Sequence, residues 1–184
     1  MSERNISLLG YALLGLVSEK PRSGFDLRKL FAETAMGSFS DSPGAIYPAL
    51  ARLEKQSLIR STVEERAALR RRRVFRLTSD GRKELRAWLR RPVTRDHVVR
   101  GQSDLMLRFA FMEIALGSNA AVAFLKDLRG QIAAYLPELK NFLNNKRKQM
   151  SLSTMLALDS GIRSYEALFD WTQYGIRMYS RKRR

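Results

Sequence analysis

The chain of 184 residues contains no cysteine, which excludes disulfides, cysteine zinc sites and thiol catalysis. His97 is the only histidine, and it lies in a polar stretch, so we expect no metal site and no serine–histidine–aspartate arrangement. Glu64 and Glu65 are adjacent in an expected turn where side chains diverge, which argues against an acid–base pair. No glycine-rich phosphate loop occurs. We therefore expect neither enzymatic activity nor a cofactor.

Long apolar segments are also missing. No run approaches the ~20 apolar residues that span a bilayer. Residues Ile6 to Val17 are apolar but short, and no cleavage pattern follows them, so we predict no signal peptide. These features, together with the lack of cysteine, predict a soluble, cytoplasmic protein without a membrane partner.

Acidic residues are scarce relative to basic ones. The chain has 34 Lys and Arg against 18 Asp and Glu, a formal net charge of +16. Residues 1–100 hold 21 of the basic and 11 of the acidic residues, and Arg70–Arg73 is the densest basic cluster. A surplus of this size favours a polyanionic partner such as nucleic acid.

Helical periodicity predicts two helices at the start of the chain. The first covers Ile6–Val17. Ser23 caps the second, and Asp26, three residues later, completes a start that resembles a capping box. The apolar positions expected on this second helix are Phe25, Leu27, Leu30 and Phe31.

A third helix is predicted over Pro43–Ser57, with Ser42 as its N-cap and Pro43 at the first helical position. Its inward stripe is predicted to be Ile46, Ala49, Leu50 and Leu53. The other side carries mostly small residues around one tyrosine. Its residues are Gly44, Tyr47, Pro48, Ala51 and Lys55. Such a face allows close approach to another surface.

A β-hairpin and a fourth helix follow. Leu58–Val63 and Arg73–Leu77 are the predicted strands, and Glu64–Arg72 the tip between them. Thr78 caps the next helix, which ends before Pro92. Three helices, a hairpin and a helix are the order of a winged helix-turn-helix domain, so we predict a mainly α fold of the α+β winged-helix type.

The remaining chain is predicted to be a linker and a helical domain. Residues 92–103 are polar without a firm period, which favours a linker between a domain at 1–91 and a helical dimerisation domain at 104–180. The helices expected there are Leu105–Leu116, Ala120 to about Lys146 with an interruption near Pro137, and Leu156–Tyr179.

The N-terminal half resembles the PadR family of bacterial transcriptional regulators over roughly residues 8–90. The motifs that carry the resemblance occur in order at compatible spacing: Leu13-Leu14-Gly15-Leu16, Ser23-Gly24-Phe25-Asp26-Leu27, Gly44 to Glu54 with Ile46-Tyr47-Pro48 at its centre, and Arg73 to Gly81. Residues 104–180 are similar in pattern to the helical C-terminal domain of the longer members.

This resemblance implies a homodimer that binds a roughly palindromic operator in double-stranded DNA through two winged domains. Members commonly repress transcription, and many release DNA when a small-molecule effector binds. The chain departs from the family at Ala45, where serine is common, and at Pro137, which interrupts a helix expected to be continuous.

The predicted DNA contacts lie on the third helix and on the hairpin. We expect Tyr47 to face DNA, the alternative being a tyrosine packed against the hairpin. Arg52 and Lys55 have an equal claim to DNA contact and to surface pairing, with Glu54 and Glu84 as partners open to Arg52. Alternation along a strand allows about two of Arg70–Arg73 to face DNA together. The predicted set is Ser42, Gly44, Ala45, Tyr47, Pro48, Arg52, Lys55, Arg66, Arg70, Arg71, Arg72 and Arg73.

Two alternatives stay open at this point. The first is a winged-helix interaction and dimerisation module without sequence-specific DNA binding. The second concerns an aromatic set that forms either ordinary core and dimer packing, which we favour, or a pocket for a flat effector. This set is Trp88, Tyr135, Tyr165, Phe169, Trp171 and Tyr174.

Overall fold

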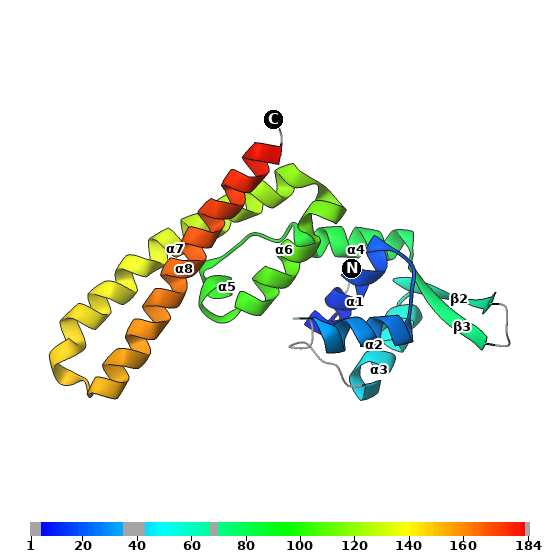
Figure 1. Ribbon diagram of the computed structural model, residues 1–184, viewed down its shortest axis with the longest axis horizontal. Coiled ribbons are helices and arrows are strands. Elements are labelled where there is room, and N and C mark those ends of the chain that lie inside the picture. The colour runs from blue at the N-terminus through cyan, green and yellow to red at the C-terminus, as the bar shows by residue number, and fades with distance from the viewer. Residues whose placement is uncertain (1–4, 35–42, 67–69, 183–184) are drawn as a thin grey trace. The chain divides into compact units, whose positions relative to one another are not determined.

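The computed structural model of the chain describes residues 5–34, 43–66 and 70–182 (Figure 1). They form two compact units, Met1–Arg91 and Pro92–Arg184. Most of the described residues are helical, and the N-terminal unit holds a small three-stranded antiparallel sheet. The predicted fold class, mainly α with a winged helix, is therefore confirmed.

Helix α1, Leu8–Glu19, is the centre of the N-terminal unit. Ser7 caps it, and every residue from Gly10 to Val17 is buried. The helix contacts α3 (Pro43–Lys55), α4 (Ser79–Leu89) and the sheet. Tyr11 of α1 stacks on the buried ring of Trp88 in α4, with ring centroids 4.3 Å apart. This packing places Trp88 in the core of the unit.

Helix α2, Gly24–Glu33, begins with the predicted capping box. The Ser23 side chain accepts a hydrogen bond from the Asp26 backbone, and the Asp26 side chain accepts one from the Ser23 backbone. Leu27 and Phe31 are fully buried as predicted, but Phe25 is 59% exposed. Phe25, one of the apolar positions of this helix, is therefore not part of its buried side, because it follows the cap in the first turn and lies outside the stripe set by Leu27 and Phe31.

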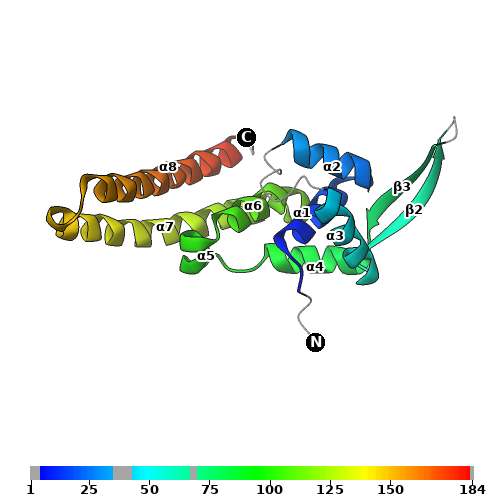
Figure 2. The same cartoon turned by 90° about the horizontal axis from the view of Figure 1, so that it is seen from below.

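The sheet has the strand order β1-β3-β2. Strands β2 (Ile59–Arg66) and β3 (Arg70–Leu77) pair in register from Ile59 opposite Leu77 to Arg66 opposite Arg70. They extend well beyond the predicted strands, so residues 64–66 and 70–72 of the predicted tip belong to the ladder. Strand β1, Arg22–Ser23, pairs with Phe75 and Val74 and has no sequence pattern of its own. Figure 2 shows the hairpin projecting from the helices of this unit.

Every regular element in the described part of the C-terminal unit is a helix. Its elements are α5 (Arg95–Arg100), α6 (Gln102–Leu116), α7 (Ser118–Lys146), the 3-10 turn η2 (Arg147–Gln149) and α8 (Leu152–Lys182). Helices α7 and α8 form a long antiparallel hairpin, visible in both ribbon views (Figures 1 and 2). Leu125, Leu128 and Ile132 of α7 are fully buried.

The prediction of a linker over residues 92–103 was wrong about local structure, because α5 occupies the middle of this segment. Thr94 and His97 form a capping box at its start, in which His97 Nδ1 lies 3.2 Å from the Thr94 backbone nitrogen. Val98 is fully buried, and α5 contacts α6 and α7. His97 is therefore a helix-capping residue.

Helix α7 continues through Pro137, so the predicted interruption was also wrong. A proline inside a helix removes the hydrogen bond to the carbonyl four residues earlier, here that of Ala133. Ala133 and Pro137 are both exposed, so water can satisfy this carbonyl. The opposite side of α7 packs on α8, which stabilises the helix across the break in its ladder.

The aromatic set is divided between the two units, and its members pack as ordinary core and surface residues. Trp88 stacks in the N-terminal unit, as described above. In the C-terminal unit, Tyr135 meets Tyr165 edge-to-face at 5.3 Å, and Trp171 meets Phe109 edge-to-face at 5.2 Å.

None of the helices in the described part of the chain is long and apolar enough to cross a membrane.

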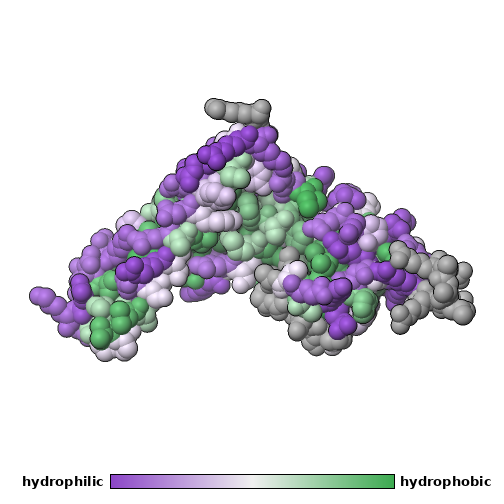
Figure 3. Space-filling model, viewed as in Figure 1, coloured by the Kyte–Doolittle hydropathy of each residue, from purple (hydrophilic) through white to green (hydrophobic). Residues whose placement is uncertain are grey.

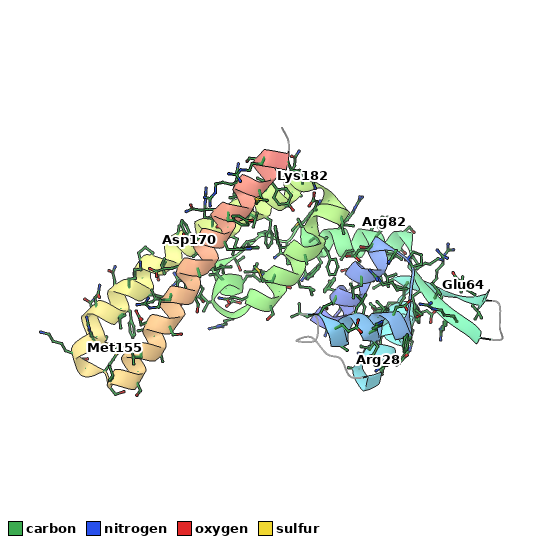
Figure 4. All side chains as sticks on the ribbon, in the orientation of Figure 1. Arg28, Glu64, Arg82, Met155, Asp170 and Lys182 are labelled. Carbon is green, nitrogen blue, oxygen red and sulfur yellow. The ribbon has the colours of Figure 1, made fainter. Side chains whose placement is uncertain are left out.

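A polar cluster fastens the end of α8 to the junction of α6 and α7. Glu113 accepts hydrogen bonds from the Tyr179 hydroxyl at 2.9 Å, Lys182 Nζ at 2.9 Å and the Ser118 hydroxyl at 3.0 Å (Figure 4 labels Lys182). Burial, followed by the hydrogen bond to Glu113 and its charge, raises the pKa of Tyr179 to about 12.

We expect Tyr179→Phe to reduce the stability of the C-terminal unit and to change its alkaline response. A tyrosine whose pKa is raised on folding contributes stability below its unfolded pKa of about 10 and loses it as the pH rises through the folded value. The wild-type free energy of unfolding should therefore fall between pH 10 and about 12 by more than that of the variant. Urea unfolding across this range measures it. Tyr174→Phe, at an exposed tyrosine of α8, is the control, and an equal change there would contradict the assignment.

Candidate nucleic-acid interface

Helix α3 has one buried and one exposed side. The buried side is the predicted stripe, with exposed fractions between 0 and 3% for Ile46, Ala49, Leu50 and Leu53. Contacts with α1, α2 and β2 cover this side. Gly44, Tyr47, Pro48 and Ala51 are exposed, and Ala45 is half-buried. Helix α3 therefore presents a surface of small side chains around Tyr47, as predicted. Ser42, the predicted N-cap, lies outside the described residues.

Tyr47 is held against the first residue of α2. A Cβ built on Gly24 would lie 2.6 Å from Tyr47 Cε1, closer than nonbonded carbon atoms approach. Only glycine leaves room for the ring at this position. The ring nevertheless remains 47% exposed. Tyr47 is thus fixed by packing on the first residue of α2, a contact that neither predicted interpretation named, and its ring stays open to a partner.

Arg52 and Lys55 are exposed in the last turn of α3, where positive charge also suits the helix dipole. The two surface partners considered for Arg52 are engaged elsewhere. Glu54 binds Arg73, and Glu84 accepts a hydrogen bond from the Tyr11 hydroxyl at 3.0 Å. The described contacts of Glu54 and Glu84 are therefore with residues other than Arg52, so they do not show the alternative in which Arg52 pairs with either.

At the basic end of the hairpin, the register places one like-charged and two oppositely charged residue pairs across the two strands. Arg66 is opposite Arg70, Glu65 opposite Arg71, and Glu64 opposite Arg72. Glu64 also receives a hydrogen bond from Arg76 at 2.9 Å (Figure 4 labels Glu64 on the hairpin). The backbones of Arg66, Arg70 and Arg71 belong to the strands, and their side chains lie outside what the structure describes.

Arg72 and Arg73 extend from β3 to the helices. The Arg72 guanidinium pairs with Asp26 at the start of α2, and that of Arg73 pairs with Glu54 of α3. Arg73 also donates from Nε to the Ser61 hydroxyl at 2.8 Å and lies over the Phe75 ring. These two arginines are therefore not simple solvent-facing charges, and each is tied to a carboxylate of the same unit.

A cavity of about 850 Å³ lies between the start of α2, the exposed side of α3 and β3. The two ion pairs lie in it together with Gly24, Phe25, Tyr47 and Phe75. The sequence prediction missed the contributions of Gly24, Phe25 and Asp26, which it treated as parts of a helix start. The signal in the sequence was the motif Ser23-Gly24-Phe25-Asp26-Leu27, which carried part of the resemblance and contains all three residues.

Comparisons with known proteins identify a family that matches the N-terminal unit. Residues 13–87 match the family described as "Transcriptional regulator PadR-like family". The chain is 28% identical over 133 residues to the negative transcriptional regulator PadR of Bacillus subtilis (strain 168). This match spans 72% of this chain and 71% of that protein.

Among solved structures, Bacillus subtilis PadR in complex with operator DNA is 23% identical, with a TM-score of 0.45 over 94% of this chain and 99% of that one. A PadR-like transcriptional regulator from Bacillus cereus is 26% identical, with a TM-score of 0.41 over 95% and 99%. The matched segment of the family begins in α1, includes α2, α3 and the hairpin, and ends in α4. The N-terminal unit thus holds, over residues 13–87, a domain that matches the PadR-like family of transcriptional regulators.

Proposed function

We propose that the chain is a repressor that binds a palindromic operator in double-stranded DNA as a homodimer, and that a small-molecule effector releases it. The curated relative supports the repressor role, since its name describes a negative transcriptional regulator. In this proposal residues 1–91 bind DNA, and the helices of residues 104–180 carry the dimer contact. We propose a cytoplasmic location on the same basis, since the curated relative is a bacterial regulator.

The exposed side of α3 carries the proposal. Small side chains at Gly44, Ala45, Pro48 and Ala51 allow the helix to lie in the major groove, which is about 12 Å wide. Tyr47 offers a hydroxyl to a phosphate, and Arg52 and Lys55 supply positive charge at the end of the helix. Few of these groups read base edges, so we assign most of the affinity to phosphate contacts, including those of the hairpin arginines Arg66 and Arg70–Arg73.

Exposed apolar side chains on the C-terminal unit support self-association. Large apolar residues with at least 44% exposure are Ile114, Phe142, Leu152, Leu156, Tyr174 and Met178. Figure 3 shows a hydrophobic surface at the turn between α7 and α8, where Leu152 and Leu156 begin α8. Surfaces of this kind are typical of protein contacts. A two-fold dimer would place two copies of α3 about one DNA turn, ~34 Å, apart.

Footprinting and gel shift test the proposal on the DNA upstream of the chain's own gene and its neighbours. We expect protection of a palindrome and a logarithm of affinity that falls linearly with the logarithm of salt concentration. The double variant Arg52→Ala, Lys55→Ala should make this slope shallower by about 2 per protomer, because each phosphate contact contributes roughly 0.9. Protection that is lost on adding small aromatic or cationic compounds would identify the effector class.

The matched control is Arg147→Ala, Lys148→Ala, which removes two exposed positive charges from the C-terminal unit. It should leave the salt slope close to that of the wild type. If no palindrome is protected, and if Tyr47 and the hairpin arginines can be replaced without functional loss, the chain is instead an interaction and dimerisation module. Equal salt slopes for the two double variants would contradict the assignment of Arg52 and Lys55 to phosphate contacts. They would leave the rest of the proposal unaffected.

A further inference from the structure

Two carboxylates lie inside the surface that we assign to a polyanion. Asp26 and Glu54 line the cavity between α2, α3 and β3, together with the arginines that they bind, Arg72 and Arg73. Negative charge next to a DNA phosphate is unfavourable unless it has another task. The contacts of the two carboxylates indicate what that task is.

Both carboxylates are fastened to the backbone of the unit. Asp26 Oδ2 accepts a hydrogen bond from the Ser23 backbone at 3.2 Å. Glu54 Oε1 accepts one from the Ser61 backbone at 3.0 Å and one from the Ser61 hydroxyl at 2.6 Å. Each carboxylate is therefore held in a fixed position by the folded backbone. Through its ion pair, it fixes the position of one guanidinium of β3.

The arginines keep donors beyond those used in these pairs. A guanidinium has five N–H donors. In the described contacts Arg73 uses Nε on the Ser61 hydroxyl and Nη2 on Glu54, and Arg72 uses Nη2 on Asp26. The side chain of Arg73 remains 59% exposed, and its described hydrogen bonds use Nε and Nη2 but not Nη1. A fixed guanidinium with free N–H groups loses less conformational entropy on binding a phosphate than a mobile one.

We infer that Asp26 and Glu54 are positioning residues for DNA binding: they hold Arg72 and Arg73 over the cavity so that the free guanidinium edges meet a DNA phosphate beside Tyr47. The inference rests on the proposed function. Neutralising either carboxylate raises the net charge by one, so binding would become stronger if the carboxylate only repelled phosphate. If the carboxylate positions an arginine, neutralising it should instead weaken binding.

The test uses the full-length chain and the duplex protected in the footprint. Glu54→Gln keeps the side-chain oxygen that Ser61 contacts but presents no charge to Arg73, and it leaves the cap of α2 intact. We expect it to bind the duplex three- to tenfold more weakly at a fixed salt concentration, and we expect a similar loss for Asp26→Asn. Unchanged or tighter binding by Glu54→Gln would overturn the inference.

The matched control is Glu64→Gln, which likewise removes one negative charge that pairs with an arginine of β3. Glu64 pairs with Arg76 and does not line the cavity, so its neutralisation should leave binding unchanged or strengthen it. If Glu64→Gln weakens binding as much as Glu54→Gln, the effect is a general one of the hairpin, and the inference fails. Thermal unfolding of each variant separates a loss of fold from a loss of position.

A measurement without DNA distinguishes failure of this inference from failure of the proposed function. In the free wild-type protein, the Arg73 Nε–H should give a resolved NMR signal with slowed hydrogen exchange, since it donates to the Ser61 hydroxyl while Nη2 of the same guanidinium binds Glu54. Glu54→Gln should abolish this protection, and Glu64→Gln should retain it. Rapid exchange in the wild type would overturn the positioning role even if DNA binding is found, whereas a wild type that binds no duplex would overturn the proposed function itself.

Discussion

Replacing Gly81 by alanine is expected to destabilise the N-terminal unit by about 3 kcal/mol, a large part of the stability of a domain. A Cβ on Gly81 would lie 1.9 Å from the carbonyl oxygen of Leu58 and 2.8 Å from Leu77 Cδ1. Because the closest atom belongs to the backbone, a side-chain rotation cannot relieve the clash. The start of α4 would have to move away from the start of β2.

Hydrogen bonds on both sides hold this close approach. The Leu58 carbonyl accepts from the Thr78 backbone at 3.1 Å, and the Leu58 N–H donates to Leu53 at the end of α3 at 2.9 Å. The Thr78 hydroxyl accepts from the Gly81 N–H at 2.9 Å and caps α4. Separating Gly81 from Leu58 would strain these bonds, each of which contributes about 1 kcal/mol. The loss should therefore exceed the helix-propensity gain of alanine over glycine, about 1 kcal/mol.

Urea unfolding in a Trp171→Phe background measures this effect, because the remaining tryptophan, Trp88, lies in the core of the N-terminal unit. The control is Gly130→Ala in α7, where a Cβ meets no atom within 4 Å. It should leave the Trp88 transition unchanged and stabilise the C-terminal unit by about 0.5–1 kcal/mol. An unchanged unfolding midpoint for Gly81→Ala would mean that the Leu58 carbonyl can yield.

The sequence predicted those elements whose local pattern agrees with their environment. The inward stripe of α3 follows from its helical spacing, and the capping box at Ser23 and Asp26 follows from side-chain chemistry alone. Helix α5 was missed because six residues show too little periodicity, although Thr94 and His97 provide its cap. Strand β1 was missed because two residues have no pattern, and its pairing depends on β3.

The candidate site shows the same division. Tyr47 and the exposed side of α3 could be predicted because one helix supplies them. The pairs Asp26–Arg72 and Glu54–Arg73 could not, because each joins residues from separate elements, and the register of the hairpin decides which arginine meets which carboxylate. The charged ends of β2 and β3 lack apolar alternation, so the sequence pattern did not show how far the ladder extends.

Gly24→Ala is expected to weaken DNA binding by about 2 kcal/mol, roughly thirtyfold, without lowering the stability of the N-terminal unit. The new methyl group would overlap the Tyr47 ring, whose nearest atom lies 2.6 Å from the ideal Cβ position. The obstacle is the end of a half-exposed side chain, so the ring moves and the backbone stays. Alanine is also the better helix former at this first position of α2. The variant should therefore keep its fold, but the Tyr47 ring should no longer lie in the position that contacts DNA.

A double-mutant cycle with Tyr47→Ala identifies the route of this effect. If Gly24→Ala acts by displacing Tyr47, it should cause no further loss of affinity in the Tyr47→Ala background, and the two single changes should be far from additive. Gel shift on the protected duplex, with the unfolding free energy measured in parallel, supplies both quantities. Additive losses would show that the start of α2 contacts DNA on its own. Full affinity in Gly24→Ala would show that the ring position fixed by Gly24 does not matter for binding, and the role of Tyr47 would then have to be assigned to packing.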